Sequence, residues 1–168
     1  MQTLLIALYL TAIVAANLLV AQFGPAVAVL NAFLFIGLDI TARDSLHESW
    51  RGRWLWPKML ALIAAGSFLS YWLNRDAGPI ALASFVAFAS AGLADTLVYM
   101  ALGERSRMVK INGSNVVSSA VDSVIFPLLA FGWPPLVWVM LGQFVAKVAG
   151  GWVWSLVLNW RRLQRVEG

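Results

Sequence analysis

Four ionisable side chains lie inside strongly apolar stretches of the sequence, where charge is least expected. They are Asp39, Asp95, Asp122 and Lys147. A charge at the centre of a membrane helix costs about 2.5 to 3.5 kcal/mol on insertion scales, so these side chains are expected to face the interior of a helix bundle. There they either pair with one another as structural contacts or line a wet cavity that holds a polar substrate. Three carboxylates outnumber the bases available to them, which favours the cavity.

Helical spacing adds further polar residues to this set. Asp39 and Arg43 are four residues apart, as are Gln143 and Lys147, so the members of each pair share one helix face. If the helix continues past Arg43, His47 extends the first stripe. Each stripe places hydrogen-bond donors beside an apolar surface.

A third group lies in the run that contains Asp122. Ser118 and Ser119 stand about one helical turn before this aspartate, and Asn115 stands about a further turn before them. Serine and asparagine in a membrane helix either bond to a neighbouring helix or contact a ligand. Spacing alone leaves both roles open.

The chain that positions these residues has the composition of a membrane protein. Of 168 residues, 61% are apolar and 12% are charged, about half the charged fraction of an ordinary soluble protein. Because about 20 apolar residues span the hydrocarbon core, the sequence predicts an all-α membrane protein, a compact six-helix bundle that forms a single transporter domain over residues 1–168. The predicted spans are about 2–21, 25–42, 57–74, 79–102, 113–132 and 135–160.

The positions of lysine and arginine predict the orientation. With the N-terminus inside, the outer connections carry only Arg75 and one span holds Lys147, whereas the other ten bases fall on inner segments. Both termini are therefore expected in the cytoplasm. The first span has neither a basic start nor a convincing cleavage site, so we expect it to be retained.

Other classes of function find little support in the sequence. With no cysteine and a single histidine, redox and metal chemistry are not expected, and Asp44, His47 and Glu48 do not form an HExxH motif. A dyad of a serine with Lys147 lacks a nucleophile elbow, and no run resembles a channel filter. We expect a small-solute transporter that is not an enzyme, needs no metal or cofactor and binds no nucleic acid.

Several segments together resemble a known family. They are GLDITARDSLHE at 37–48, NGSNVVSSAVDSVIF at 112–126 and GQFVAKVAGG at 142–151, with AANLLV at 15–20 and ASFVAF and ADTLVY at 83–88 and 94–99. In this order they are similar to the queuosine precursor transporter family, also called the vitamin uptake transporter family. One departure is Gly92, where some members carry glutamine.

The resemblance implies an importer in the cell inner membrane for 7-cyano-7-deazaguanine and 7-aminomethyl-7-deazaguanine, which are salvaged for queuosine in tRNA. A guanine-like edge offers paired N–H donors that a carboxylate accepts, so Asp122 is the expected acceptor. Gln143 and Lys147 would reach the carbonyl edge or the 7-substituent, and Asp39 would orient Arg43. Phe126, Tyr99 and Trp154 are candidates for packing on the flat ring. The expected binding set is Asn17, Asp39, Arg43, Asp95, Asn115, Ser119, Asp122, Phe126, Gln143 and Lys147.

The sequence leaves three alternatives open. Transport is either facilitated or coupled to protons through an aspartate. The competing function is a substrate-binding subunit of an energy-coupling factor vitamin transporter, which would need separate ATPase subunits. Gly142, Ala146 and Gly150 form a row of small residues that packs either within one protomer or across a homodimer.

Overall fold

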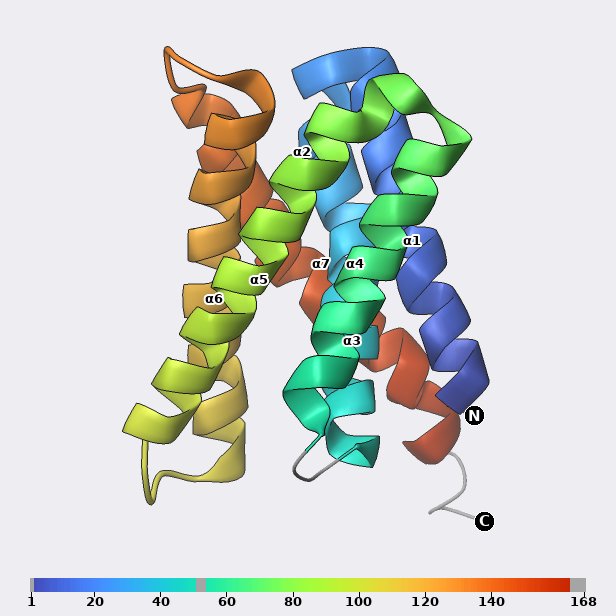
Figure 1. Ribbon diagram of the computed structural model, residues 1–168. Coiled ribbons are helices and arrows are strands. Elements are labelled where there is room, and N and C mark those ends of the chain that lie inside the picture. Colours follow the sequence, from blue (N-terminus) through green and yellow to red (C-terminus); the bar gives the residue numbers. More distant parts are fainter. Residues whose placement is uncertain (1, 51–53, 164–168) are drawn as a thin grey trace.

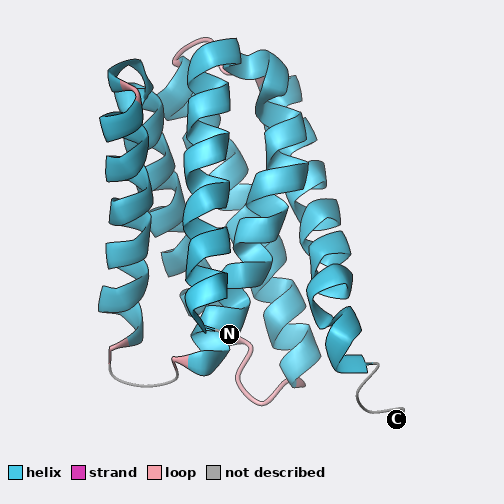
Figure 2. Ribbon diagram, turned by 90° about the vertical axis from the view of Figure 1, so that its right-hand side faces the viewer, coloured by secondary structure: helices cyan, strands magenta, loops and turns pink. Residues whose placement is uncertain are grey.

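The apolar runs of the sequence form long helices that pack side by side (Figures 1 and 2). The computed structural model describes residues 2–50 and 54–163, and these residues contain no strand. The α-helices are α1 (Gln2–Phe23), α2 (Ala28–Asn31), α3 (Gly37–Ser49), α4 (Leu55–Leu73), α5 (Gly78–Ala101), α6 (Arg107–Phe131) and α7 (Val137–Leu163). Two short 3₁₀ turns, η1 (Gly24–Val27) and η3 (Arg75–Ala77), and a π-helical segment, η2 (Ala32–Ile36), complete the order.

The chain reverses direction between α1 and α2. Gly24 has φ of +64°, a conformation that glycine adopts without steric cost, and Pro25 follows at the start of η1. From there η1, α2, η2 and α3 follow one another without a break to Ser49, so the helix predicted to end at about 42 extends further. The result is an antiparallel hairpin in which α3 lies against α1 (Figure 1).

The backbone of the π-helical segment touches α7. A Cβ atom added to Gly37 would lie 2.6 Å from the carbonyl carbon of Gly150, and one added to Gly150 would collide with the backbone oxygen of Phe33. At Gly142, an added Cβ would lie 2.8 Å from a Val29 methyl group. The small-residue row of α7 therefore packs within the protomer, so it supplies no argument for a dimer.

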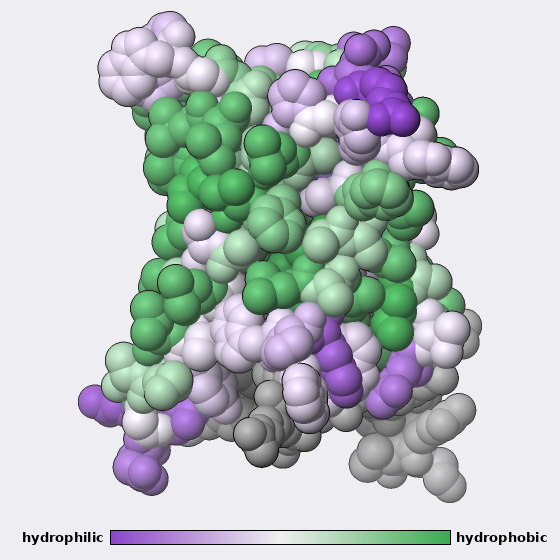
Figure 3. All heavy atoms as spheres, viewed as in Figure 1, coloured by the Kyte–Doolittle hydropathy of each residue, from purple (hydrophilic) through white to green (hydrophobic). Residues whose placement is uncertain are grey.

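The outer surface and the ends of the bundle fit a membrane protein. An apolar band crosses the visible face, and hydrophilic residues gather at its two ends (Figure 3). Four stretches of the described chain are long and apolar enough to cross a membrane: Gln2–Arg43, Arg75–Ala101, Asn112–Phe131 and Val137–Trp154. The first of these contains the reversal at Gly24, and α4 is not among the four. The start of α1 and the end of α7 lie at the same end of the bundle (Figure 1).

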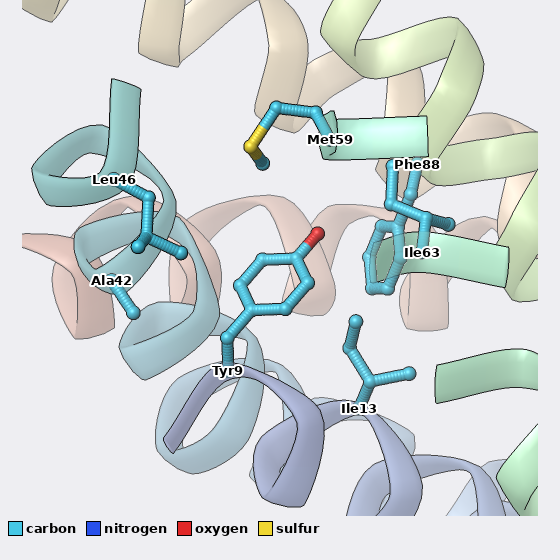
Figure 4. Close-up of a cluster of buried hydrophobic side chains, with 7 residues drawn as sticks. All are labelled: Tyr9, Ile13, Ala42, Leu46, Met59, Ile63 and Phe88. Carbon is cyan, nitrogen blue, oxygen red and sulfur yellow. The ribbon is translucent and has the colours of Figure 1, made fainter. Parts of the chain in front are cut away.

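A buried apolar cluster joins α1, α3, α4 and α5 (Figure 4). It consists of Tyr9, Ile13, Ala42, Leu46, Met59, Ile63 and Phe88. The hydroxyl of Tyr9 points into this cluster (Figure 4). A second cluster of Val20, Ala28 and Ile80 lies nearer the other end of α1, with Phe126 and Phe131 packed against it. A pocket lies beside both clusters, because Phe88 of the first and Val20 and Ala28 of the second line it.

Candidate polar site between α6 and α7

An ion pair inside the bundle joins α6 to α7. Lys147 Nζ lies 2.9 Å from Asp122 Oδ2 and donates to Gln143 Oε1 at 3.0 Å. All three residues are at most 5% exposed. Gln143 and Lys147 are one turn apart on α7, so the predicted spacing places both beside Asp122.

Two atoms of this cluster lack a hydrogen-bond partner among the described residues. They are Asp122 Oδ1, an acceptor, and Gln143 Nε2, a donor. Leaving a buried polar group unsatisfied costs about 1 to 3 kcal/mol, and buried polar atoms in proteins are otherwise almost always paired. The partner atoms Oδ2 and Oε1 both bind the same ammonium group, so the free acceptor and the free donor belong to side chains that meet at Lys147. Such a pair can bind a ligand that offers one donor and one acceptor.

These atoms border a pocket of about 310 Å³. The pocket is lined by Ala16, Asn17, Val20, Ala28, Asn31, Ala32, Ile36, Ser84, Phe88, Asp122, Phe126, Gln143 and Lys147. Phe88 of α5 and Phe126 of α6 supply aromatic wall, and the small residues of α1 and α2 supply a flat apolar wall. The lining therefore combines aromatic and apolar walls with the polar side chains of Asp122, Gln143 and Lys147.

Asn17 lines the pocket, yet its amide group is already engaged. Its Nδ2 donates to Ser70 Oγ at 3.0 Å, and its Oδ1 accepts from Ser84 Oγ at 2.5 Å. Ser70 in turn donates to the backbone oxygen of Gly66 at 2.8 Å. Asn17 thus ties α1 to α4 and α5, and it holds Ser84 at the pocket wall.

Asn31 is a pocket residue that the sequence analysis did not single out. It lies at the end of α2, is 4% exposed and donates from Nδ2 to the backbone oxygen of Ala16 at 3.0 Å. This bond fixes the orientation of the amide within the pocket wall. The sequence offers one sign of its role, since Asn31 is the one polar residue between Gly24 and Gly37.

The predicted binding residues do not all meet at this pocket. It brings together Asn17, Asp122, Phe126, Gln143 and Lys147. The other five predicted residues, Asp39, Arg43, Asp95, Asn115 and Ser119, are not part of its lining.

Asp39 and Arg43 belong to a second polar layer on the α3 side. Arg43 Nη2 lies 3.5 Å from Asn115 Oδ1, and both Asp39 and Arg43 are buried. Neither Asp39 nor Arg43 lines the pocket, so the predicted polar residues form two groups rather than one chamber.

The remaining candidates lie elsewhere. Asp95 on α5 is 9% exposed and its Oδ1 lacks a hydrogen-bond partner among the described residues. Ser119 is buried on α6. Tyr99 and Trp154, candidates for ring packing, are not in the pocket lining, and Tyr99 instead lies 4.6 Å below the Lys110 ammonium. The side chains of Asp44, His47 and Glu48 fall outside those that the structure describes.

Comparisons with known proteins place the chain in a family. A family model described as "Putative vitamin uptake transporter" matches residues 3–159. No curated protein and no solved structure matches the chain. The match covers all seven α-helices up to the last turn of α7, including every residue of the pocket. The buried ion pair, the unsatisfied donor and acceptor and the surrounding apolar helices thus belong to a multi-pass membrane protein of the vitamin uptake transporter family.

Proposed function

We propose that this protein imports queuosine precursors of the 7-deazaguanine type across the cell inner membrane and acts as a transporter rather than an enzyme. One observation carries the proposal: Asp122 Oδ1 and Gln143 Nε2 are a buried acceptor and donor without partners, beside a pocket with aromatic walls. The lactam edge of a deazaguanine presents an N–H donor next to a carbonyl acceptor, which is the complementary pattern. Membership in a vitamin uptake family supports transport of such a small molecule.

The structure suggests a pose that differs from the bidentate contact expected from sequence. Because Asp122 Oδ2 already binds Lys147, the carboxylate offers one oxygen to the ligand rather than two. In the proposed pose this oxygen accepts the ring N–H, and Gln143 Nε2 donates to the ring carbonyl. In the same proposed pose Asn31 accepts from the exocyclic amine, and Phe88 and Phe126, which also line the pocket, pack on the ring.

We further propose six membrane spans with both termini in the cytoplasm. The stretch Gln2–Arg43 contains a chain reversal and so supplies two crossings, and α4, with 19 residues, is long enough for another. The connections at one end of the bundle carry most of the basic residues, which supports a cytoplasmic location for that end.

The proposal is tested by uptake of radiolabelled 7-cyano-7-deazaguanine into liposomes that contain the purified chain alone. Loss of a hydrogen bond to a charged group costs about 1.5 to 3 kcal/mol, so Asp122→Asn is expected to lower uptake about tenfold to a hundredfold. Asp76→Asn, the same change at an exposed position in η3, serves as the control and should leave uptake unchanged. Unchanged uptake by Asp122→Asn would contradict the assignment of the site.

The same experiment separates the competing function. A substrate-binding subunit of an energy-coupling factor transporter binds its vitamin but needs ATPase subunits to move it. Uptake by the purified chain alone therefore excludes that alternative. Binding without uptake would favour it.

A further inference from the structure

The charges of the pocket cancel. Among the residues that the structure describes, Asp122 and Lys147 are the only charged ones in its lining, and they form a direct ion pair. Among the side chains that the structure describes, the second polar layer holds one buried carboxylate, Asp39, and one buried guanidinium, Arg43, whose charges are opposite. Every other lining residue is apolar or a neutral amide or hydroxyl.

This neutrality bears on what the pocket accepts. A charged group that leaves water for a low-dielectric site loses several kcal/mol of solvation, and only a close opposite charge restores it. In this pocket an ammonium group near Asp122 would also lie near the Lys147 ammonium, and a carboxylate near Lys147 would lie near Asp122, because the two side chains are 2.9 Å apart. A ligand of either charge therefore meets an opposite charge that is already paired with its neighbour.

We infer that the pocket selects uncharged solutes and rejects both ammonium-bearing and carboxylate-bearing ones of the same shape. This inference rests on the proposed function and narrows it. Of the two deazaguanines, the neutral 7-cyano compound is the preferred cargo. The 7-aminomethyl compound is disfavoured, since its primary amine is protonated at neutral pH.

The test uses three deazaguanines that differ only at the 7-substituent: the neutral nitrile, the cationic aminomethyl and the anionic carboxylate. Each is measured as an unlabelled competitor of labelled 7-cyano-7-deazaguanine uptake into liposomes containing the full chain. The nitrile is expected to compete at a concentration at least about tenfold lower than either charged compound, equivalent to about 1.4 kcal/mol. Equal competition by the aminomethyl or the carboxylate compound would overturn the inference and leave the proposed function standing. Absence of uptake of the labelled 7-cyano-7-deazaguanine itself would overturn both.

Variants that change the charge of the pocket are expected to change its preference between the nitrile and the aminomethyl compound. Lys147→Met leaves Asp122 without its partner, so the aminomethyl compound should gain at least about tenfold relative to the nitrile. Gln143→Glu adds a carboxylate while keeping the ion pair, and it should shift the preference in the same direction, which gives a second readout if Lys147→Met does not fold. Lys58→Met, the same change at an exposed position outside the pocket, should retain the wild-type ratio. A ratio that stays at the wild-type value in both pocket variants would overturn the inference.

Discussion

Asn17 illustrates how a polar residue in an apolar helix serves the site through other residues. Its amide group binds Ser70 of α4 on one side and Ser84 of α5 on the other. Neither bond was predictable, because sequence does not say which helices pack against α1. Asn17 is predicted from the family resemblance as a substrate-binding residue, whereas its contacts indicate a structural role at the pocket wall.

We predict that Asn17→Ala destabilises the folded bundle. It removes two buried interhelical hydrogen bonds, each of which is worth about 0.6 kcal/mol on average in membrane proteins and up to about 1.7. The expected loss in free energy of unfolding is about 1 to 2 kcal/mol, seen as a lower unfolding midpoint in detergent.

Ser67→Ala provides the matched control in α4. The Ser67 hydroxyl is buried without a hydrogen-bond partner in the described part of the chain, so its removal should leave the midpoint unchanged or raise it. Equal midpoints for Asn17→Ala and Ser67→Ala would show that the Asn17 bonds contribute nothing.

Several predicted site residues share the same sequence features, charge and helical spacing, but they do not all lie at the pocket. Asp122, Gln143 and Lys147 were singled out because charge and helical spacing put them on facing surfaces, and the structure brings these three together. Asp39 and Arg43 have the same spacing signal but lie in the neighbouring layer. Periodicity gives the face of a helix, whereas the depth at which two helices cross depends on packing that no spacing rule contains.

At the scale of elements, the crossing of η2, α3 and α7 depends on glycine. The backbones meet at Gly37 and Gly150 with no room for a side chain at either position. This close approach brings Gln143 and Lys147 of α7 to the pocket bordered by Ala32 and Ile36 of η2. Close contact of this kind is the usual function of small residues in membrane helices.

We predict that Gly150→Ala disrupts this crossing, whereas Gly151→Ala does not. The new methyl group at position 150 would overlap the backbone oxygen of Phe33, which cannot rotate away. At position 151 the nearest atom is a methyl carbon of Ile40 at 3.9 Å, an ordinary contact. Overpacking costs about 1 to 3 kcal/mol, so Gly150→Ala should lower the unfolding midpoint and the yield of monodisperse protein in detergent. Similar behaviour of the two variants would contradict the close crossing.

Helix boundaries were predicted best where glycine and proline mark them and worst where charged residues continue a helix. The helix predicted over 79–102 is Gly78–Ala101 in the structure. By contrast, α6 begins at Arg107 rather than near 113, because Ser106 caps it by accepting a hydrogen bond from the backbone N–H of Val109 at 3.4 Å. The basic composition of its first turns predicts a loop, whereas the Ser106 cap allows these turns to be helical.

At the scale of the whole molecule, α5 runs from one end of the bundle to the other (Figure 1). The exposed Asp76 lies in η3, directly before α5, and the exposed Glu104 follows α5, so the two residues lie at opposite ends of this helix. Since α5 joins them in a single crossing, their locations report the orientation of the protein in the membrane.

We predict that Asp76→Cys reacts with an impermeant maleimide when the cytoplasmic membrane is intact, and that Glu104→Cys reacts after the membrane is opened. The natural chain has no cysteine, so each variant carries a single labelling site. Each is measured by labelling with and without permeabilisation, and the unsubstituted protein is the blank. The opposite pattern would invert the proposed topology.

The π-helical segment Ala32–Ile36 affects the rotation, about the helix axis, of the residues that follow it. A π-helical segment contains one residue more than the same length of α-helix, and one residue corresponds to about 100° of rotation. If the same residues instead formed a regular α-helix, the additional residue would rotate Asp39 and Arg43 by about 100° relative to α2. In this hairpin the π-helical turn, rather than any particular side chain, sets the direction in which these two charged residues point.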